Sequence, residues 1–391
     1  MTHVVVIGAS LSGSVAAISL AQQGVRVSLI DKAPFPRRKP CGEGLSARGL
    51  GELERIGIDI TRYPDLAWGL KGYRINSGSS WSTISDRSGL VGIRRSELDA
   101  ELISYASKLP LITIHQAITL DSIESDAEKF VITFGRHAIT TPYVVIADGA
   151  SSPTLRALGK KLAVPASPRL GASSSWQITR GTLEPYVHTS FISGGEMYLT
   201  PLSRGGVNIS VLGSKTLIQR AVHPALLREM VKSVATQLNI EIEMTAPPLG
   251  SGSLNSRCHG GHFRGAFVVG DACETFDPCA GFGMTHATLS GRLAAEHILK
   301  AQSNSSRDRA LQDYSAARER IVRPIRGFTR LTSTMMSSRL GRIGFPIAAK
   351  TGVAGMVSHA VHSTTNGEPL RSLLSLVGGL REPAYVEGVT P

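Results

Sequence analysis

The sequence predicts an α/β protein in which a discontinuous Rossmann-like domain carries an inserted β-rich domain and precedes a helical C-terminal region. The first observation is the strand, tight turn and helix pattern that begins at Val4–Ile7, a run of β-branched residues typical of buried parallel strands. The second is that two similar stretches, at 143–149 and 265–271, lie far along the chain. The third is the short alternating strands that dominate 163–250 between them.

The first unit has the features of a nucleotide-binding turn. Gly8 follows the strand, Gly13 lets the next helix pack closely on the sheet, and Asp31 ends a second strand. N–H groups at such a helix start attract a pyrophosphate, and a carboxylate after the second strand accepts ribose hydroxyls. Ser10 replaces the middle glycine of G-x-G-x-x-G, so a βαβ unit without a nucleotide is the alternative. The contacts expected here are Gly8, Ser10, Leu11, Ser12, Gly13, Asp31 and Lys32.

Length and composition limit the class of protein. The chain has 391 residues, 42% of them hydrophobic, which is enough for two domains with cores of their own. No run of eighteen apolar residues occurs, and the N-terminus lacks the basic segment of a signal peptide, so we expect a cytoplasmic protein. The four cysteines have no C-x-x-C spacing, and His259 and His262 have no evident third partner, so no metal site is predicted.

Positive charge gathers toward the C-terminus of a chain whose net charge is +12. Few aromatic residues accompany it, which argues against nucleic-acid binding. A face with Ile325 and Phe328, opposite Arg323, Arg326 and Arg330, favours peripheral contact with an anionic membrane or an acidic carrier protein. A solvated basic helix is the alternative. The basic residues between Tyr314 and Ala360 are Arg318, Arg320, Arg323, Arg326, Arg330, Arg339, Arg342 and Lys350.

The remaining elements are expected in the following order. A proline-rich loop follows Asp31 and cannot be helical. A helix should cover 46–56, and a second helix should begin near Arg95 with Ser96 as its cap. Strands are expected at 69–84, at Leu111–His115, Ala117–Ser122 and Phe130–Phe134 as a small meander, and at Val187–Ile192, Glu196–Thr200 and Val207–Leu212. Helices are expected at Pro224–Gln237 and from about Gly283 to Ala301.

Four stretches together carry a resemblance to a known group. They are the opening turn with Asp31, Arg95 within R-x-x-L-D-x-x-L, the segment A-D-G-A-S-S-P-T-L-R from Ala147, and the segment G-D-A-C-E-T-F-D-P-C-A-G-F-G-M from Gly270. In this order they resemble the FAD oxidoreductases of the p-hydroxybenzoate hydroxylase fold. This group includes class A flavin monooxygenases, flavin-dependent halogenases and geranylgeranyl reductases. The resemblance spans residues 8 to 284, most of the chain.

The resemblance implies bound FAD and a set of residues around it. Asp271 is suited to accept a hydrogen bond from the ribitol, Gly281 and Gly283 let the backbone approach the flavin, and the helix that follows directs its positive end at the ring. The further contacts that the resemblance implies are Gly42, Arg95, Leu120, Asp148, Gly270, Pro278, Phe282 and Met284. In this scheme 1–68, 89–162 and 251–310 bind FAD, 69–88 and 163–250 form the substrate-binding β-sheet domain, and 311–391 is the basic helical region.

Three residues are candidates for chemistry. The stretch K-P-C-G-E-G-L-S from Lys39 resembles a segment of geranylgeranyl reductases whose cysteine lies near the flavin, so Cys41 and Glu43 are candidates. A packing thiol and a solvated loop carboxylate are the alternatives. Tyr198 stands where those reductases have tryptophan in Y-x-W-x-F-P, and Thr200 stands where they have phenylalanine. These two departures weaken the reductase hypothesis, so Tyr198 is the third candidate.

The sequence therefore predicts an FAD-dependent monooxygenase that acts on a small hydrophobic or aromatic molecule through a flavin C4a-hydroperoxide. No second G-x-G-x-x-G follows a strand, so NAD(P)H is expected to dock transiently as electron donor. The first alternative is an ene-reductase that acts on a prenyl chain. The second, from another class, is an FAD-binding scaffold without turnover.

Overall fold

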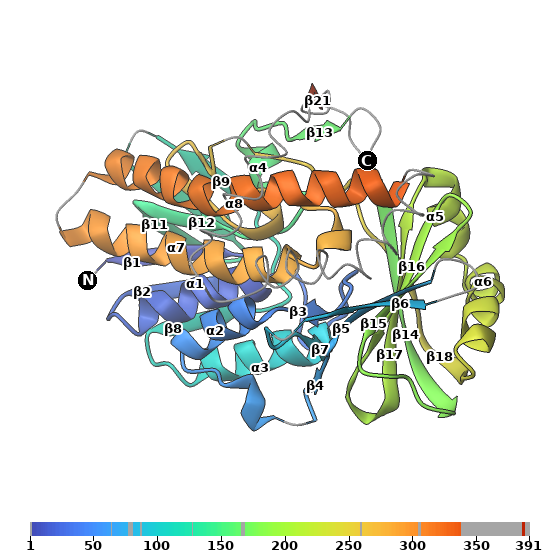
Figure 1. Cartoon of the computed structure of the whole chain (residues 1–391). Coiled ribbons are helices and arrows are strands. Elements are labelled where there is room, and N and C mark those ends of the chain that lie inside the picture. The colour runs from blue at the N-terminus through green and yellow to red at the C-terminus, as the bar shows by residue number, and fades with distance from the viewer. Residues whose placement is uncertain are drawn as a thin grey trace.

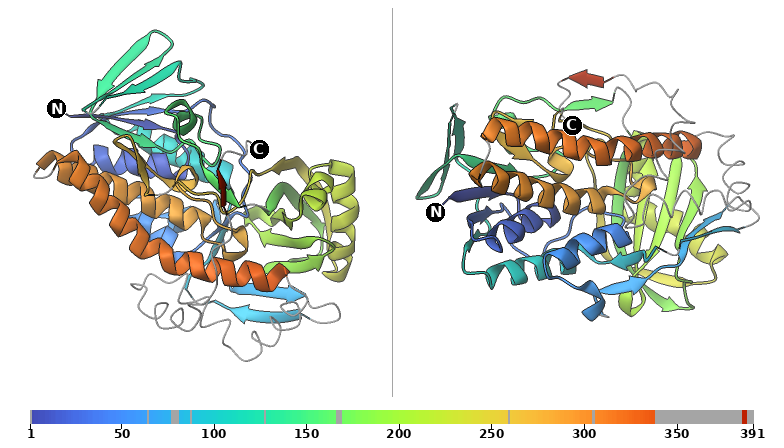
Figure 2. Two further views of the ribbon diagram at one scale, coloured as in Figure 1. Left: turned by 90° about the horizontal axis from the view of Figure 1, so that it is seen from above. Right: turned by 60° about the vertical axis from the view of Figure 1, so that its left-hand side comes forward.

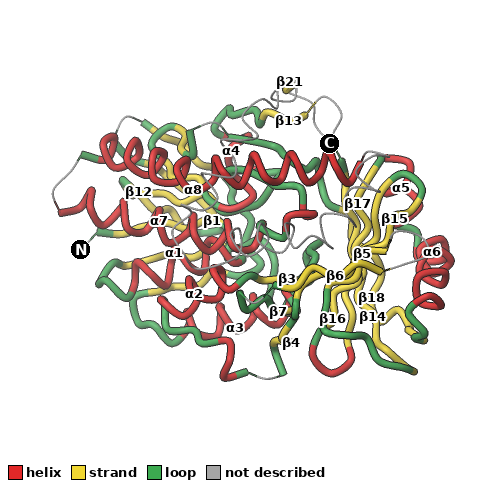
Figure 3. Tube along the Cα trace, viewed as in Figure 1, coloured by secondary structure: helices red, strands yellow, loops and turns green. Residues whose placement is uncertain are grey.

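The computed structural model describes residues 2–337 and 385–387, apart from positions 64, 77–80, 87, 127, 166–168, 259 and 304–305. Two large sheets dominate the described part and lie side by side, with helices packed on each (Figures 1 and 3). A long helix, α8 (Arg307–Ser337), runs across the top of the molecule from the first sheet toward the second. The α/β fold class predicted from the sequence is confirmed.

The first sheet is the predicted Rossmann-like sheet. Its order is β19-β20-β12-β1-β2-β8, with β1, β2, β8, β12 and β20 parallel and β19 antiparallel at one edge. Its fully buried strands are runs of β-branched residues, as parallel sheets covered on both faces require. Its strands are β1 (His3–Ile7), β2 (Arg26–Ile30), β8 (Ile112–His115), β12 (Tyr143–Ile146), β19 (His262–Phe263) and β20 (Ala266–Val268).

Two layers cover this sheet. Val4 and Val6 face the core shared with the helices α1, α3 and α7, whereas Val5 and Ile7 face a core shared with a three-stranded sheet and α4. Figure 2 shows the three-stranded sheet projecting at the N-terminal end. The elements of these layers are α1 (Leu11–Ala21), α2 (Ala47–Arg55), α3 (Arg95–Ser107), α4 (Pro153–Ala157), α7 (Gly283–Ser303), β9 (Ser122–Ser125), β10 (Phe130–Phe134) and β11 (His137–Thr141).

The second sheet is the inserted β-rich part. Its order is β18-β14-β17-β16-β15-β5-β6, so the hairpin β5–β6 from early in the chain pairs with strands some hundred residues later. Two helices, α5 and α6, cover one face and share its apolar core. Its elements are β5 (Gly72–Asn76), β6 (Trp81–Ser85), β14 (Leu170–Arg180), β15 (Val187–Ile192), β16 (Gly195–Pro201), β17 (Gly206–Gly213), α5 (Lys215–Ala221), α6 (Pro224–Gln237) and β18 (Glu241–Gly250).

Short elements join the two sheets. The strand β7 pairs antiparallel with β3 and with β4, and this small sheet leads into α3. At the top of the molecule β13 pairs with β21, near the C-terminal end of the chain. These elements are β3 (Gly44–Leu45), β4 (Ala67–Gly69), β7 (Val91–Ile93), β13 (Ala163–Pro165) and β21 (Tyr385–Glu387), with the 3-10 turns η1 (Ile60–Arg62), η2 (Ser203–Gly205), η3 (Gly270–Ala272) and η4 (Pro278–Ala280).

Three local predictions were wrong. The segment Leu111–His115 contributes β8 to the parallel sheet rather than to the meander, and Ala117–Ser122 is not a strand, since β9 begins only at Ser122. Ser96 lies inside α3, whose N-cap is Arg94 without a side-chain capping bond. Sequence alternation identified the strands but not their partners, because pairing is decided by residues far along the chain.

The basic C-terminal region also differs from its prediction. Arg326, which we placed on a polar face for a membrane or carrier protein, is buried in α8, and so is Arg318. Arg339, Arg342 and Lys350 lie outside the described residues. Among the residues that the structure describes, no helix is long and apolar enough to cross a membrane. Peripheral attachment of this region stays a prediction, as do the domain boundaries.

Candidate functional site

A large cavity lies between the two sheets. Its floor is the start of α1 and of α7, and one wall is formed by the loop 39–44. The opposite wall comes mainly from the second sheet, with Tyr73, Val187 and Leu212 among its apolar residues, and Leu90, directly before β7, packs with Val187. The predicted site residues that line the cavity are Ser10, Leu11, Ser12, Cys41, Gly42, Glu43, Arg95, Tyr198, Asp271, Pro278, Gly281, Gly283 and Met284.

The turn between β1 and α1 requires glycine for two different reasons. Gly8 has φ +100°, and a Cβ on it would lie 2.3 Å from the carbonyl oxygen of Ala147. A Cβ on Gly13 would lie 1.8 Å from the carbonyl oxygen of Gly8. Neither position accepts a side chain, so α1 begins close against β1 and β12 and presents Ser10 to Ser12 to the cavity.

Arg95 organises the cavity floor. Its side chain is 7% exposed, and its Nη2 donates to Ser10 Oγ at 2.9 Å and to both carboxylate oxygens of Asp99 at 3.2 Å. Ser10 Oγ in turn donates to Asp99 Oδ2 at 2.8 Å. The serine that departs from the glycine pattern therefore ties the α1 turn to α3. Burial would lower the pKa of Arg95, but Asp99 outweighs this and raises it, so the guanidinium stays charged.

Asp31 is held by the turn that it follows. Its Oδ2 accepts a hydrogen bond from the Ala9 N–H at 2.8 Å and from Arg37 Nη2 at 2.8 Å. Its Oδ1 accepts from the Ala33 N–H at 2.9 Å. The carboxylate is fixed at the carboxyl end of β2, the position at which Rossmann-like sheets bind ribose.

The loop that carries Cys41 and Glu43 is anchored to both sheets. The Cys41 N–H donates to Ser173 Oγ at 3.0 Å on β14, and Glu43 Oε1 accepts from the Arg95 N–H at 2.9 Å. Cys41 Sγ accepts from Arg95 Nη1 at 3.7 Å. Burial raises the pKa of Cys41, with Arg95 opposing it, and burial raises the pKa of Glu43 more than Arg95 lowers it. Both pKa shifts are therefore toward the protonated form.

A compact charged cluster stands behind Tyr198. Arg169 forms ion pairs with Glu196 and, at 3.1 Å, with Asp277, and both carboxylates are almost fully enclosed. Burial, together with Glu196, raises the pKa of Tyr198, so its hydroxyl stays protonated. The Tyr198 ring packs with Leu70 and other apolar residues of the cavity wall.

Several predicted residues lie outside the cavity lining. Lys32 is exposed beyond β2, Leu120 packs on the core under the three-stranded sheet, and Phe282 is fully buried against Phe276 and Leu289. The Leu120 and Phe282 side chains are core residues, and their assignment as cofactor contacts stays a prediction. The predicted residues outside the lining are Gly8, Gly13, Asp31, Lys32, Leu120, Asp148, Gly270 and Phe282.

Asp148 acts on the loop that follows β12. Its Oδ2 accepts from the Thr154 N–H at 2.9 Å at the start of α4. This agrees with a role in fixing loop geometry.

Sequence analysis missed the residues that connect distant segments. Lys39 Nζ lies 3.4 Å from Asp271 Oδ2, and Ser173 and Ser210 hold the backbone of Cys41 from two strands of the second sheet. Thr275 and Phe276 also line the cavity. No local pattern marks these residues, because each acts through a partner more than a hundred residues away or through its place in a wall.

The residues of the cavity fit a bound dinucleotide. Gly42, Gly44 and Gly283 line it, and a Cβ on any of them would meet no atom within 4 Å, so the backbone is bare where a flat ring must approach. Arg95 Nε is enclosed and has no hydrogen-bond partner in the part of the chain that the structure describes. The α7 N-terminus adds donors and a positive dipole end. Within the described residues, no cluster of His, Cys, Asp and Glu could hold a metal ion.

Comparisons with known proteins agree with this fit. Residues 1–184 match the model of an FAD binding domain. The chain is 29% identical to menaquinone reductase of Mycolicibacterium smegmatis, across 89% of this chain and 88% of the relative. It is 26% identical to digeranylgeranylglycerophospholipid reductase 1 of Methanopyrus kandleri, across 76% of this chain and 80% of the relative.

Solved structures share the fold. The flavin-dependent brominase Bmp2 superposes with a TM-score of 0.78 at 16% identity, covering 96% of this chain and 99% of that one. The p-nitrophenol 4-monooxygenase PnpA of Pseudomonas putida superposes with a TM-score of 0.73 at 15% identity, covering 97% and 98%. These likenesses establish the architecture, and the FAD cofactor predicted from the sequence is confirmed.

Proposed function

Because the chain belongs to the FAD-dependent oxidoreductases of the p-hydroxybenzoate hydroxylase fold, we propose that it reduces a carbon–carbon double bond of a prenyl chain with electrons from NAD(P)H. The observation that carries the proposal is the pair of side chains that can give up a proton, Cys41 and Glu43, whose pKa values burial raises, at a largely apolar cavity. FAD, when bound, supplies the hydride. Saturation of an alkene also needs one proton, and the loop 41–43 holds proton donors beside the cavity floor.

Glu43 is the better placed of the two donors. Its Oε1 is fixed by the Arg95 N–H, whereas Oε2 is enclosed and has no hydrogen-bond partner among the described residues. The substrate would gain a hydride at one alkene carbon and a proton from the Glu43 carboxyl at the other, after which solvent reprotonates the carboxylate. Cys41 stays a thiol and helps to close the wall over this site.

The apolar wall supports a prenyl substrate. Tyr73, Val187 and Leu212 line the cavity from the second sheet, and Leu90 lines it from the segment before β7. Together they would bury the isoprene units away from water. Relatives that match along most of the chain are named as reductases, one of menaquinone and one of a geranylgeranyl lipid. This support moves the reductase hypothesis ahead of the monooxygenase that we predicted from the sequence alone.

Oxygenation is the second candidate. It is favoured by Tyr198 and Thr200, which replace the tryptophan and phenylalanine of the reductase motif in the cavity wall. A solved structure with the same fold is named as a monooxygenase of p-nitrophenol. In this case the cavity would take a hydrophobic or aromatic molecule, and the wall around Tyr198 would exclude water from the oxygen-transfer step.

Product mass separates the two candidates. Purified FAD-loaded protein with NADPH or NADH is incubated with a prenylated quinone or a geranylgeranyl lipid, with and without oxygen. We expect a product heavier by two hydrogens that forms without oxygen, and Glu43→Gln should slow its formation about 100-fold. The matched control, Glu97→Gln, changes a partly exposed glutamate on α3 and should act like wild type. A product heavier by one oxygen atom would establish the second candidate, and flavin that NAD(P)H cannot reduce would favour the scaffold hypothesis.

A further inference from the structure

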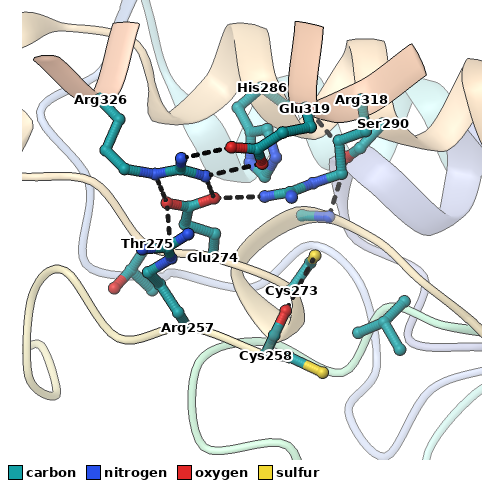
Figure 4. A network of polar contacts seen from close by, with 12 residues as sticks. Arg257, Cys258, Cys273, Glu274, Thr275, His286, Ser290, Arg318, Glu319 and Arg326 are labelled. Atoms are coloured by element: carbon teal, nitrogen blue, oxygen red, sulfur yellow. Dashed lines mark hydrogen bonds and ion pairs between the residues drawn. The ribbon is translucent and has the colours of Figure 1, made fainter. Parts of the chain in front are cut away.

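A buried ionic cluster joins the cavity wall to α8. Glu274 is 3% exposed, and its carboxylate accepts hydrogen bonds from Arg318 Nη2 at 2.5 Å and from Arg326 Nε and Nη2 at 2.7 and 2.9 Å. Figure 4 shows both guanidinium groups reaching down from the helix to this one carboxylate. Glu319 lies on the other side of Arg326, with contacts of 2.7 and 3.1 Å.

The cluster carries a net positive charge. Arg257 Nε completes it, 3.5 Å from Glu274 Oε1, so three guanidinium groups face two carboxylates and leave one positive charge. Burial alone would raise the pKa of Glu274, but Arg326 and Arg318 hold it at about 2, so the carboxylate stays ionised.

His286, the nearest titratable ring, does not add to that charge. It stands in the first turns of α7, 1% exposed, and packs edge-on against Phe276 at 5.1 Å. Burial, followed by the charge of Arg318, lowers its pKa to about 3. The imidazole is therefore neutral near pH 7, and the positive charge near the start of α7 belongs to the arginines.

Glu274 also holds part of the cavity. The segment 271–276 contributes Asp271, Thr275 and Phe276 to the lining, and Glu274 is the buried residue directly before Thr275. Replacing a buried ion cluster with apolar side chains is often neutral or stabilising, so stability alone does not explain why this wall is fastened by charges. The charges of Arg318, Glu274 and Arg326 act on His286 in the first turn of α7, so the cluster lies close to the end of α7 that lines the cavity.

We propose that Glu274, Arg318 and Arg326 are positioning residues that set the redox balance of the bound FAD. They fix the wall 271–276 against α8, and their net positive charge reinforces the α7 dipole. The ring gains two electrons and one proton on reduction and then carries an extra negative charge, so a positive charge nearby stabilises the reduced cofactor more than the oxidised one. This inference rests on FAD binding alone and holds for reduction and for oxygenation.

The experiment compares two arginines of one helix. Arg326→Gln removes a charge from the cluster, and Arg323→Gln removes an exposed charge three residues away. The midpoint potential of bound FAD is measured by reductive titration against reference dyes, and FAD affinity and melting temperature are measured for apoprotein and holoprotein. We expect Arg326→Gln to lower the ratio of the affinities for reduced and oxidised FAD roughly tenfold. This corresponds to a midpoint potential that is lower by about 30 mV for two electrons. Arg323→Gln should change the affinity ratio less than about twofold.

A second pair of variants separates charge from structure. Glu274→Gln makes the cluster more positive, so its potential should rise where that of Arg326→Gln falls. Arg326→Lys keeps the positive charge but loses the planar guanidinium that donates two parallel hydrogen bonds. Its melting temperature should therefore fall while the midpoint potential stays near that of wild type. A purely structural cluster would lower the melting temperature in all three buried variants without shifts of opposite sign. That result would overturn the proposal and leave the FAD assignment intact.

Discussion

Two of the buried arginine–carboxylate clusters around the cavity differ in the length of chain that they join. Arg95 and Asp99 lie four residues apart on α3 and, with Ser10, close a single helix junction. Glu274 meets Arg318 and Arg326 across 44 and 52 residues and fastens an outer helix to the cavity wall. The first cluster shapes the floor on which the cofactor must lie, whereas the second adjusts a wall from behind. Loss of the first should therefore remove the cofactor, and loss of the second should change its behaviour.

The largest effect is expected at the first cluster. Arg95→Met leaves Asp99 as a buried charge without its arginine, which costs about 3–5 kcal/mol of unfolding free energy. It also removes a donor from the cavity floor, so the purified variant should hold little FAD. Flavin absorbance per chain and urea denaturation measure the two effects. The control is Arg62→Met. The Arg62 side chain pairs with Asp59 but is 82% exposed, so this variant should keep its flavin. Full flavin content in Arg95→Met would contradict this role for the floor.

The next effect tests the second cluster by acid. The pKa of Glu274 is about 2 when folded and near 4.5 when unfolded, so its stabilisation is complete above pH 4.5 and is lost as the pH falls toward 2. The depressed pKa corresponds to roughly 3 kcal/mol. Urea midpoints measured between pH 5 and 2.5 should fall less steeply in Glu274→Gln than in wild type. Equal slopes would mean that the carboxylate titrates normally and that the arginines do not hold it.

The sequence separation between interacting residues also decides which features could be predicted from the sequence. Gly8, Gly13, Asp31 and the start of α3 at Arg95 follow local rules, because a tight turn, a strand end and a helix start each occupy a few consecutive residues. The fold class was predictable for this reason, since repeated strand patterns of one kind mark a parallel sheet. The FAD cofactor followed from these turns taken together with their order along the chain.

Contacts between residues far apart in the sequence could not be predicted from local patterns. The arginines of α8 formed a basic helical pattern in the sequence, and only the partner Glu274 shows that Arg318 and Arg326 point inward. Ser173, which holds Cys41 from β14, is one of many serines in a strand. Phe282 lies between two lining glycines but turns into the core against Phe276 and Leu289, so membership of the motif does not decide where its side chain points.

A smaller effect comes from His286, whose pKa is lowered first by burial and then by the charge of Arg318 in the second cluster. Its pKa is about 3 when folded and near 6.5 when unfolded, so the unfolded chain takes up a proton first and stability falls below pH 6.5. Between pH 7 and 5 this amounts to about 2 kcal/mol. His286→Leu should remove that slope, which chemical denaturation at several pH values measures. An unchanged slope over this range would assign the acid sensitivity to another group.

The smallest effect is expected where a pair of the same chemistry faces solvent. Arg309 and Asp313 stand four residues apart on α8, 3.2 Å between nitrogen and oxygen, with side chains 69% and 50% exposed. Water screens such a pair, and ordering both side chains offsets most of its attraction, so it contributes only about 0.3–0.5 kcal/mol. Arg309→Gln should lower the unfolding free energy by no more than this, and the difference should vanish in 1 M salt. The flavin potential should match that of wild type. A loss above about 1 kcal/mol, or a shifted potential, would mean that α8 acts on the cavity as a rigid whole rather than through the buried contacts at Glu274.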